Sequence, residues 1–91
     1  MTRHYDITVK GKVQGVSYRF STHAKAIKLG LTGYVKNMPD GSVFIEAEGK
    51  EDAINKLIEW CYYGPPRARV SEVNATESEV KGYKNFELKR L

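Results

Sequence analysis

Residues 11–19 (GKVQGVSYR) combine residue types that could bind a phosphoryl group. Gly11 and Gly15 allow tight backbone turns that expose N–H groups. The helical pattern that follows adds unpaired N–H donors and the positive end of a helix dipole. Arg19 stands at the start of that helix and carries a planar guanidinium suited to two phosphate oxygens. The segment therefore predicts a phosphate-binding loop that holds a dianion with backbone amides and one arginine.

Arg19 taken alone has a simpler interpretation, a solvated arginine in the first turn of a helix, which is the commoner case. However, a cation at a helix N-terminus is unfavourable by about 0.3–1 kcal/mol unless an anion lies nearby. The adjoining loop supplies the donors that an anion needs, so we favour anion binding.

Asn37 is the second candidate for a role in catalysis. It precedes the turn residues Pro39, Asp40 and Gly41, where an asparagine commonly bonds its own backbone. The expected topology offers another role, because the end of the second strand can lie at the same sheet edge as the phosphate-binding loop. A neutral amide there could donate to one group, accept from another and so orient a water for attack. On the sequence alone the turn-forming interpretation is preferred, and the expected topology adds some weight to the second.

The other reactive side chains are expected to be structural. His4 and His23 are predicted to be surface or boundary residues, and Cys61 to be a core residue. Packing against the end of the sheet is predicted for the aromatic residues Trp60, Tyr62 and Tyr63. No set of His, Cys, Asp or Glu residues has metal-ligand spacing, so no metal site is predicted.

Length and composition predict a single globular domain over residues 1–91. The chain is 41% hydrophobic and 29% charged, and its net charge of +4 favours anionic partners in general. No apolar run approaches the roughly 20 residues of a membrane span, and we expect no signal peptide before the first strand. One cysteine cannot form an internal disulfide. A cytoplasmic protein that does not bind membranes is therefore expected.

Periodicity predicts strands and helices in the order strand, helix, strand, strand, helix, strand, with a short terminal strand around Phe86 and Leu88. The first helix is expected to bury Phe20, Ala24, Ile27 and Leu31, and Gly30 to end it. The other expected elements are strands 5–10, 31–37, 42–48 and 68–77, a turn at 38–41, a helix over 51–62, and a bulge near Val70 and Val73. This order predicts an α+β, ferredoxin-like split βαββαβ sandwich: an antiparallel sheet with two helices on one face and a short extra C-terminal strand.

Three segments of the chain resemble motifs of the acylphosphatase family. Residues 9–19 (VKGKVQGVSYR) are similar to its first signature, and residues 33–43 (GYVKNMPDGSV), with Gly49 beyond them, to its second. Residues 64–70 (GPPRARV) are also typical of the family, so the resemblance spans nearly the full chain. Tyr18 departs from the usual Phe or Met, and its phenolic oxygen is expected to affect the rim of the loop or the affinity for substrate.

The resemblance implies a hydrolase that cleaves acyl phosphates to a carboxylate and inorganic phosphate without a metal or organic cofactor. It implies that Arg19 binds the phosphate and that Asn37 positions the attacking water. The backbone amides expected to share in phosphate binding are those of Gln14, Gly15, Val16, Ser17, Tyr18 and Arg19. Inorganic phosphate or sulfate is the expected product-like ligand, and nothing in the sequence requires more than a monomer.

The chemistry of the substrate fits a site without an acid or base. An acyl phosphate leaves as a carboxylate, whose conjugate acid has a pKa of about 4, so the leaving group needs no protein acid. Charge stabilisation and in-line placement of water can then supply most of the catalysis. The proton of the water could pass to a phosphoryl oxygen of the substrate.

Two other functions fit the same topology. An RNA-binding module needs aromatic side chains on the open face of the sheet. The outward positions of the third strand are instead Ser42, Phe44, Glu46 and Glu48, so nucleic acid is not an expected partner. The second alternative is a non-catalytic regulatory domain that binds phosphorylated ligands. The end of the chain at Leu91 favours a free-standing enzyme over this alternative.

Overall fold

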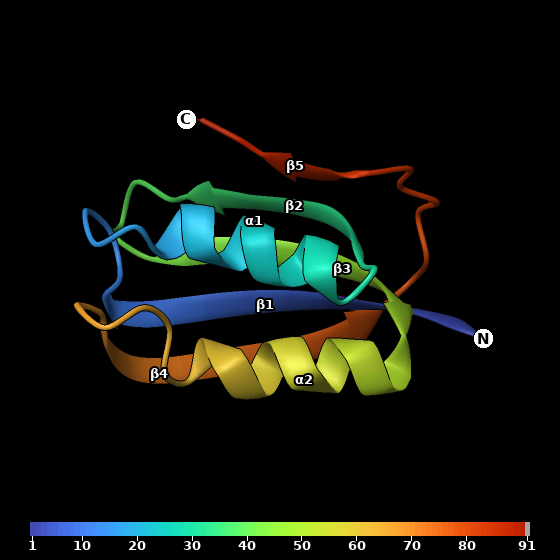
Figure 1. The fold of residues 1–91 in the computed structure, drawn as a ribbon, viewed down its shortest axis with the longest axis horizontal. Helices are drawn as coiled ribbons and strands as arrows, with labels where there is room; N and C mark the ends of the chain where they lie inside the picture. Colours follow the sequence, from blue (N-terminus) through green and yellow to red (C-terminus); the bar gives the residue numbers. More distant parts are fainter. Residues whose placement is uncertain (91) are drawn as a thin grey trace.

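Five strands and two helices follow one another in the predicted order (Figure 1). The structure, a computed structural model, describes residues 1–90. The elements are β1 (Thr2–Lys12), α1 (Tyr18–Lys28), β2 (Thr32–Asn37), β3 (Val43–Lys50), α2 (Glu51–Cys61), β4 (Arg69–Ser78) and β5 (Phe86–Leu88). Both helices lie on one face of the sheet, so the α+β ferredoxin-like prediction is confirmed.

The strands lie in the order β4-β1-β3-β2-β5 across the sheet. β3 pairs antiparallel with β1 on one side and with β2 on the other, and β4 is antiparallel to β1. The antiparallel sheet of β1 to β4 is as predicted, and the short extra C-terminal strand β5 adds to β2 in parallel. The chain crosses from β4, at one edge, to the opposite edge before β5 begins, and it arrives running in the direction of β2 (Figure 1).

The predicted bulge lies where β1 approaches the loop before α1. Lys10 pairs with Glu72 and Gly11 pairs with Val70, so Ser71 has no partner in the register. Gly11 has a φ of 127°, and a side chain at this position would collide with the backbone carbonyl of Arg69. A glycine is therefore required where the bulged strand lies against the end of β1.

The core lies between the sheet and the two helices. The sheet contributes Ile7, Val9, Val35 and Ile45, all fully buried. α2 buries Ile54, Leu57 and Cys61, each at 0% exposure, so Cys61 is a core residue as predicted. Trp60 packs against Tyr18 with ring centroids 5.4 Å apart. Tyr62 and Tyr63 are 54% and 76% exposed, so the prediction that they pack against the sheet was wrong.

The predicted apolar face of α1 was also wrong. Phe20 and Ile27 are 61% and 55% exposed, whereas the buried residues are Tyr18, Thr22 and Ala26. The hydroxyl of Thr22 donates to the carbonyl oxygen of Tyr18 at 2.8 Å, which satisfies this polar group inside the core. A periodicity argument that counts only apolar residues misses a face built on a tyrosine and a threonine.

The helix-free face of the sheet holds a buried polar cluster, although open polar positions were expected there. His4, Glu46 and Glu48 are 0%, 7% and 2% exposed, so the prediction of a surface or boundary His4 was wrong. The backbone N–H groups of Lys81, Gly82 and Tyr83 donate to the carboxylate of Glu48. The segment between β4 and β5 is thereby bound over this face of the sheet.

The same cluster brings together a histidine and three carboxylates whose spacing in the sequence gave no sign that they are neighbours. His4 Nδ1 lies 2.7 Å from Glu48, and His4 Nε2 lies 2.8 Å from Asp6. Ligand atoms of His4, Asp6 and Glu46 all lie within 4.8 Å of one another. Each has a protein partner, including the Lys81 ammonium 3.0 Å from Glu46, so the cluster is satisfied by protein groups alone.

Candidate active site

The loop between β1 and α1 has two residues in the left-handed region. Gly15 has a φ of 74° and Ser17 a φ of 67°, and Ser17 is the only non-glycine residue with a positive φ among residues 1–90. Ser17 is the N-cap of α1, but its side chain makes no capping hydrogen bond. Turns with left-handed residues point successive N–H groups to one side and form anion-binding concavities. The first amides of α1 are thus left without a side-chain cap beside this loop.

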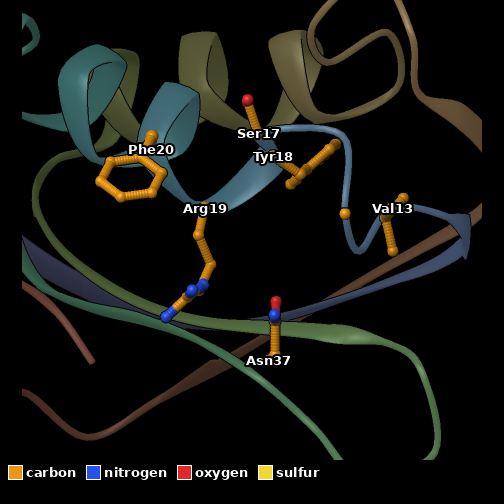
Figure 2. Close-up of a pocket in the computed structure, with 7 residues that line it drawn as sticks. Val13, Ser17, Tyr18, Arg19, Phe20 and Asn37 are labelled. Carbon is orange, nitrogen blue, oxygen red and sulfur yellow. The ribbon is translucent and has the colours of Figure 1, made fainter. Parts of the chain in front are cut away.

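A cavity of about 240 Å³ opens beneath this loop. Figure 2 shows the Arg19 side chain extending from the first turn of α1 and the Asn37 amide pointing from β2 into the same space. The structure therefore brings these two predicted site residues together. The cavity is lined by Val13, Gly15, Ser17, Tyr18, Arg19, Phe20 and Asn37.

Arg19 is half-buried and held by the C-terminal segment. Its Nη1 donates to the carbonyl oxygen of Lys89 at 2.7 Å. No carboxylate in the described part of the chain lies within ion-pair distance of Arg19. The positive charge and the remaining N–H donors are therefore available to an anion in the cavity.

Asn37 is the last residue of β2 and lies opposite Val43 of β3. The turn-forming interpretation of Asn37 was wrong, because Asp40 performs that role. The Asp40 carboxylate accepts from the backbone N–H of Ser42 at 2.9 Å and from its hydroxyl at 2.6 Å. These hydrogen bonds lower the pKa of Asp40. The turn is thus closed without the Asn37 side chain.

Gln14 and Val16 do not line the cavity. Val16 is 5% exposed and packs in the core, whereas Gln14 is half-buried. The side-chain amide of Gln14 donates to the carbonyl oxygens of Met38 and Ser42, each at 2.9 Å. The sequence predicted only a backbone role for Gln14, and no local pattern signals a partner more than twenty residues away.

Tyr18 is 1% exposed, and its hydroxyl points into the protein. The hydroxyl donates to the carbonyl oxygen of Cys61 at 2.7 Å, and burial raises the pKa of Tyr18. The phenolic oxygen therefore does not lie at the rim of the loop, so that part of the expectation was wrong, whereas an effect on substrate affinity stays a prediction. Burial also raises the pKa of the Cys61 thiol to about 12, which leaves it unreactive at neutral pH.

The residues that line the cavity include no histidine and no carboxylate. His23 lies at a boundary as predicted, with Nε2 3.1 Å from the carbonyl oxygen of Phe86. The arrangement can therefore bind an anion and orient a water, but it offers no side chain suited to general acid or base catalysis. The cavity lining also offers none of the carboxylate and imidazole ligands that divalent metal ions prefer.

Comparisons with known proteins agree with this geometry. The family model described as acylphosphatase matches residues 5–88. An acylphosphatase of Acaryochloris marina is 51% identical over 90% of this chain and 88% of that protein. The solved acylphosphatase of Coxiella burnetii superposes with a TM-score of 0.94 at 45% identity, covering 97% of this chain and 93% of that one. The acylphosphatase of Bacillus subtilis gives a TM-score of 0.93 at 39% identity, covering 98% and 99%.

Proposed function

Because the chain belongs to the acylphosphatase family and hydrolyses acyl phosphates to a carboxylate and inorganic phosphate, we propose residue roles for this reaction. The observation that carries the proposal is the convergence of Arg19 and Asn37 on the cavity beneath the loop. The phosphoryl group occupies this cavity. The Arg19 guanidinium and the backbone amides of residues 14–19 bind its oxygens.

The Asn37 amide positions the attacking water. The side-chain amide has an N–H group that donates and an oxygen that accepts. The oxygen can accept a hydrogen bond from the water and so turn the water's lone pair towards phosphorus, while the N–H group donates to a phosphoryl oxygen. Its position at the end of β2 places this amide on the other side of the cavity from the α1 end (Figure 2). Fixing water and phosphoryl group in one geometry replaces much of the entropy cost of the bimolecular reaction.

The leaving group departs as a carboxylate without protonation. Its conjugate acid has a pKa of about 4, so no general acid is needed at neutral pH. The proton of the attacking water passes to a phosphoryl oxygen of the substrate. The side chains that line the cavity fit this mechanism. None of them is a carboxylate or a histidine, and together they do not form a set of metal ligands. The reaction therefore proceeds without a metal or an organic cofactor.

We further propose that residues 1–91 act as one domain and as a monomer in the cytoplasm, with no nucleic-acid or membrane partner. The unpaired Cys61 is buried, which suits a reducing compartment. No helix within residues 1–90 is long and apolar enough to cross a membrane. The helix-free face of the sheet is occupied by buried carboxylates and the segment bound over them. Its aromatic side chains Tyr34, Phe44 and Tyr83 contact one another, and the Tyr34 and Tyr83 hydroxyls donate to Glu46, so these rings do not form an open stacking platform for bases.

A benzoyl phosphate hydrolysis assay tests the residue roles. Arg19→Ala should lower kcat/KM by about 10³-fold or more and raise the inhibition constant of inorganic phosphate, because it removes a charge aimed at the transition state. Arg67→Ala is the matched control, since Arg67 is an exposed arginine outside the cavity. Its kinetic constants should stay within about twofold of the wild type, as expected for a surface substitution. Near-normal kinetics of Arg19→Ala would refute the phosphate-binding role.

A further inference from the structure

The side chain of Gln14 connects the phosphate-binding loop to the turn that follows Asn37. Its single Nε2 atom donates both hydrogens, one to the carbonyl oxygen of Met38 and one to that of Ser42. Met38 comes directly after Asn37 at the end of β2, and Ser42 comes directly before β3. One amide therefore binds both ends of the β2–β3 turn.

The turn does not need Gln14 in order to close. The Met38 N–H donates to the Ser42 carbonyl oxygen at 2.8 Å, and the Gly41 N–H donates to the Met38 carbonyl oxygen at 3.1 Å. The Asp40 carboxylate adds two bonds to Ser42. The two bonds from Gln14 are therefore additional to a complete turn, and their geometric effect is to fix the turn relative to the loop.

The sheet itself does not make this connection. The pairing of β1 with β3 ends at Val9 and Val43, and beyond that point β1 continues only along β4, as far as Lys12. The phosphate-binding loop and the β2–β3 turn are therefore not joined to each other by strand pairing. Among the described side chains of residues 13–17, only that of Gln14 forms a hydrogen bond to the turn.

We propose that Gln14 is a positioning residue that sets the distance between the phosphate-binding loop and the Asn37 amide. The inference rests on the proposed roles of Arg19 and Asn37, because it concerns the alignment of the groups that they bind. The loop fixes the phosphorus atom and Asn37 fixes the water, and Gln14 keeps these two separate pieces of chain in one geometry. Misplacement by about 1 Å can cost about 10²-fold in rate, so two hydrogen bonds at this junction are enough to matter.

Two substitutions isolate the donors of Gln14. Gln14→Met keeps the length of the side chain but has no donor, and Gln14→Glu keeps its shape but points an acceptor at two carbonyl oxygens. Both should lower kcat with benzoyl phosphate by about tenfold or more, because the water is misaligned. The inhibition constant of inorganic phosphate should change by less than about threefold, because the loop amides and Arg19 are retained.

The pH profile separates positioning from simple loss of packing. The carboxyl introduced by Gln14→Glu can donate one hydrogen bond when it is protonated, whereas its ionised form cannot. The kcat of Gln14→Glu relative to that of Gln14→Met should therefore rise as the pH falls through the pKa of the introduced carboxyl. A constant ratio between the two variants across that range would overturn the inference.

Stability provides the matched control. Tyr83→Phe removes a hydrogen bond to Glu46 on the helix-free face of the sheet, at a residue that does not line the cavity. Tyr83→Phe should lower the free energy of unfolding about as much as Gln14→Met does, while its kcat stays within about twofold of the wild type. If Gln14→Met likewise loses stability but keeps kcat, Gln14 is only structural and the inference is overturned.

A double variant identifies the residue through which Gln14 acts. With the amide of Asn37 already removed by Asn37→Ala, adding Gln14→Met should lower kcat by less than about twofold further, since a shared function is lost only once. Fully additive effects would overturn the inference and leave the role of Asn37 intact. If Asn37→Ala alone keeps the wild-type kcat, the proposed role of Asn37 fails, and the inference fails with it.

Discussion

The carbonyl oxygen of Lys89 accepts a hydrogen bond from Arg19 Nη1 at 2.7 Å, across seventy residues of sequence. Lys89 is itself fixed, because its N–H donates to the carbonyl oxygen of Val35 in β2 at 2.9 Å. The bond leaves the other guanidinium nitrogens of Arg19 free for a ligand. The C-terminal segment therefore holds the arginine at the cavity while contributing no residue to the cavity lining.

Deletion of residues 89–91 should raise the KM for benzoyl phosphate and the inhibition constant of inorganic phosphate. Both changes should be about tenfold, because Arg19 loses a charge-assisted hydrogen bond worth about 1.5 kcal/mol or more and must be ordered by the ligand instead. Lys89→Ala is the matched control, since it keeps the carbonyl oxygen and should bind phosphate nearly as the wild type does. Equal constants for the deletion and the wild type would show that this bond does not position Arg19.

Asn37→Ala and Asn37→Asp should differ in their effects on phosphate. Asn37→Ala should lower kcat by about 10²-fold or more and leave inhibition by inorganic phosphate mostly intact, because the loop still binds the anion. Asn37→Asp should also weaken phosphate binding, since a carboxylate beside a dianion is repulsive. Steady-state kinetics and inhibition assays measure both. Loss of phosphate affinity in Asn37→Ala would show that Asn37 binds phosphate in addition to, or instead of, positioning water.

Activity should survive complete removal of divalent ions. The side chains around the cavity offer an arginine, an asparagine and a serine, and not the carboxylate or imidazole ligands of a catalytic metal. After exhaustive dialysis against EDTA, kcat with benzoyl phosphate should stay within about 20% of its starting value if no metal-bound water is involved. A loss of activity that added Mg²⁺ or Zn²⁺ restores would contradict the mechanism.

Tyr18→Phe should lower the free energy of unfolding by about 1–3 kcal/mol, because the buried carbonyl of Cys61 loses its donor. Urea unfolding measures the change. Tyr62→Phe is the matched control, since Tyr62 is 54% exposed, and it should change stability by no more than about 0.5 kcal/mol. Equal stabilities of the two variants would mean that the bond from Tyr18 contributes little.

The protein should lose stability in acid through Glu46. Burial by itself raises the pKa of Glu46, but hydrogen bonds from Tyr34, Tyr83 and Lys81 outweigh it and lower the pKa to about 2. A carboxyl whose pKa is lower in the folded state stabilises the fold above its ordinary pKa of 4.5. This contribution is lost as the pH falls from 4.5 towards about 2, where the folded protein also becomes protonated.

Chemical unfolding between neutral pH and pH 2 tests this prediction. The free energy of unfolding of Glu46→Gln should depend less on pH in the acid range than that of the wild type, because the titrating group is gone. Glu87→Gln, at an exposed position, serves as the control and should keep the wild-type slope. Parallel curves for Glu46→Gln and the wild type would rule out Glu46 as a source of acid sensitivity.

Local patterns were sufficient to predict the fold and the shared position of Arg19 and Asn37 at one cavity. Alternation and helical periodicity gave the order of the elements, and Asp40 with Gly41 marked the turn before β3. Arg19 follows a loop with glycines, and Asn37 ends a strand whose partner is fixed by that turn. Because hairpin register and the crossing of β1 into α1 are local properties, the shared position of these residues could be expected before the structure was known.

The contacts that could not be predicted join residues far apart in the sequence. Gln14 reaches Met38, and Arg19 reaches Lys89, through backbone carbonyls that every residue possesses. Carbonyl acceptors carry no sequence signal, so only the three-dimensional arrangement identifies them. The buried position of His4 likewise involves a distant segment. His4 contacts the buried carboxylate of Glu48, and the Gly82 N–H donates a hydrogen bond that helps to offset the cost of burying that carboxylate.

The parallel addition of β5 has a consequence for self-association. β5 and its flanking residues occupy the outer side of β2, where the Gly33 N–H donates to Asn85 and the Val35 carbonyl accepts from Lys89. Without this cover, β2 would become an edge strand with unpaired N–H and C=O groups, which can template the addition of a strand from another molecule. The C-terminal strand thus also covers an edge of the sheet, and proteolytic removal of this strand would leave the outer side of β2 open to strand addition from another molecule.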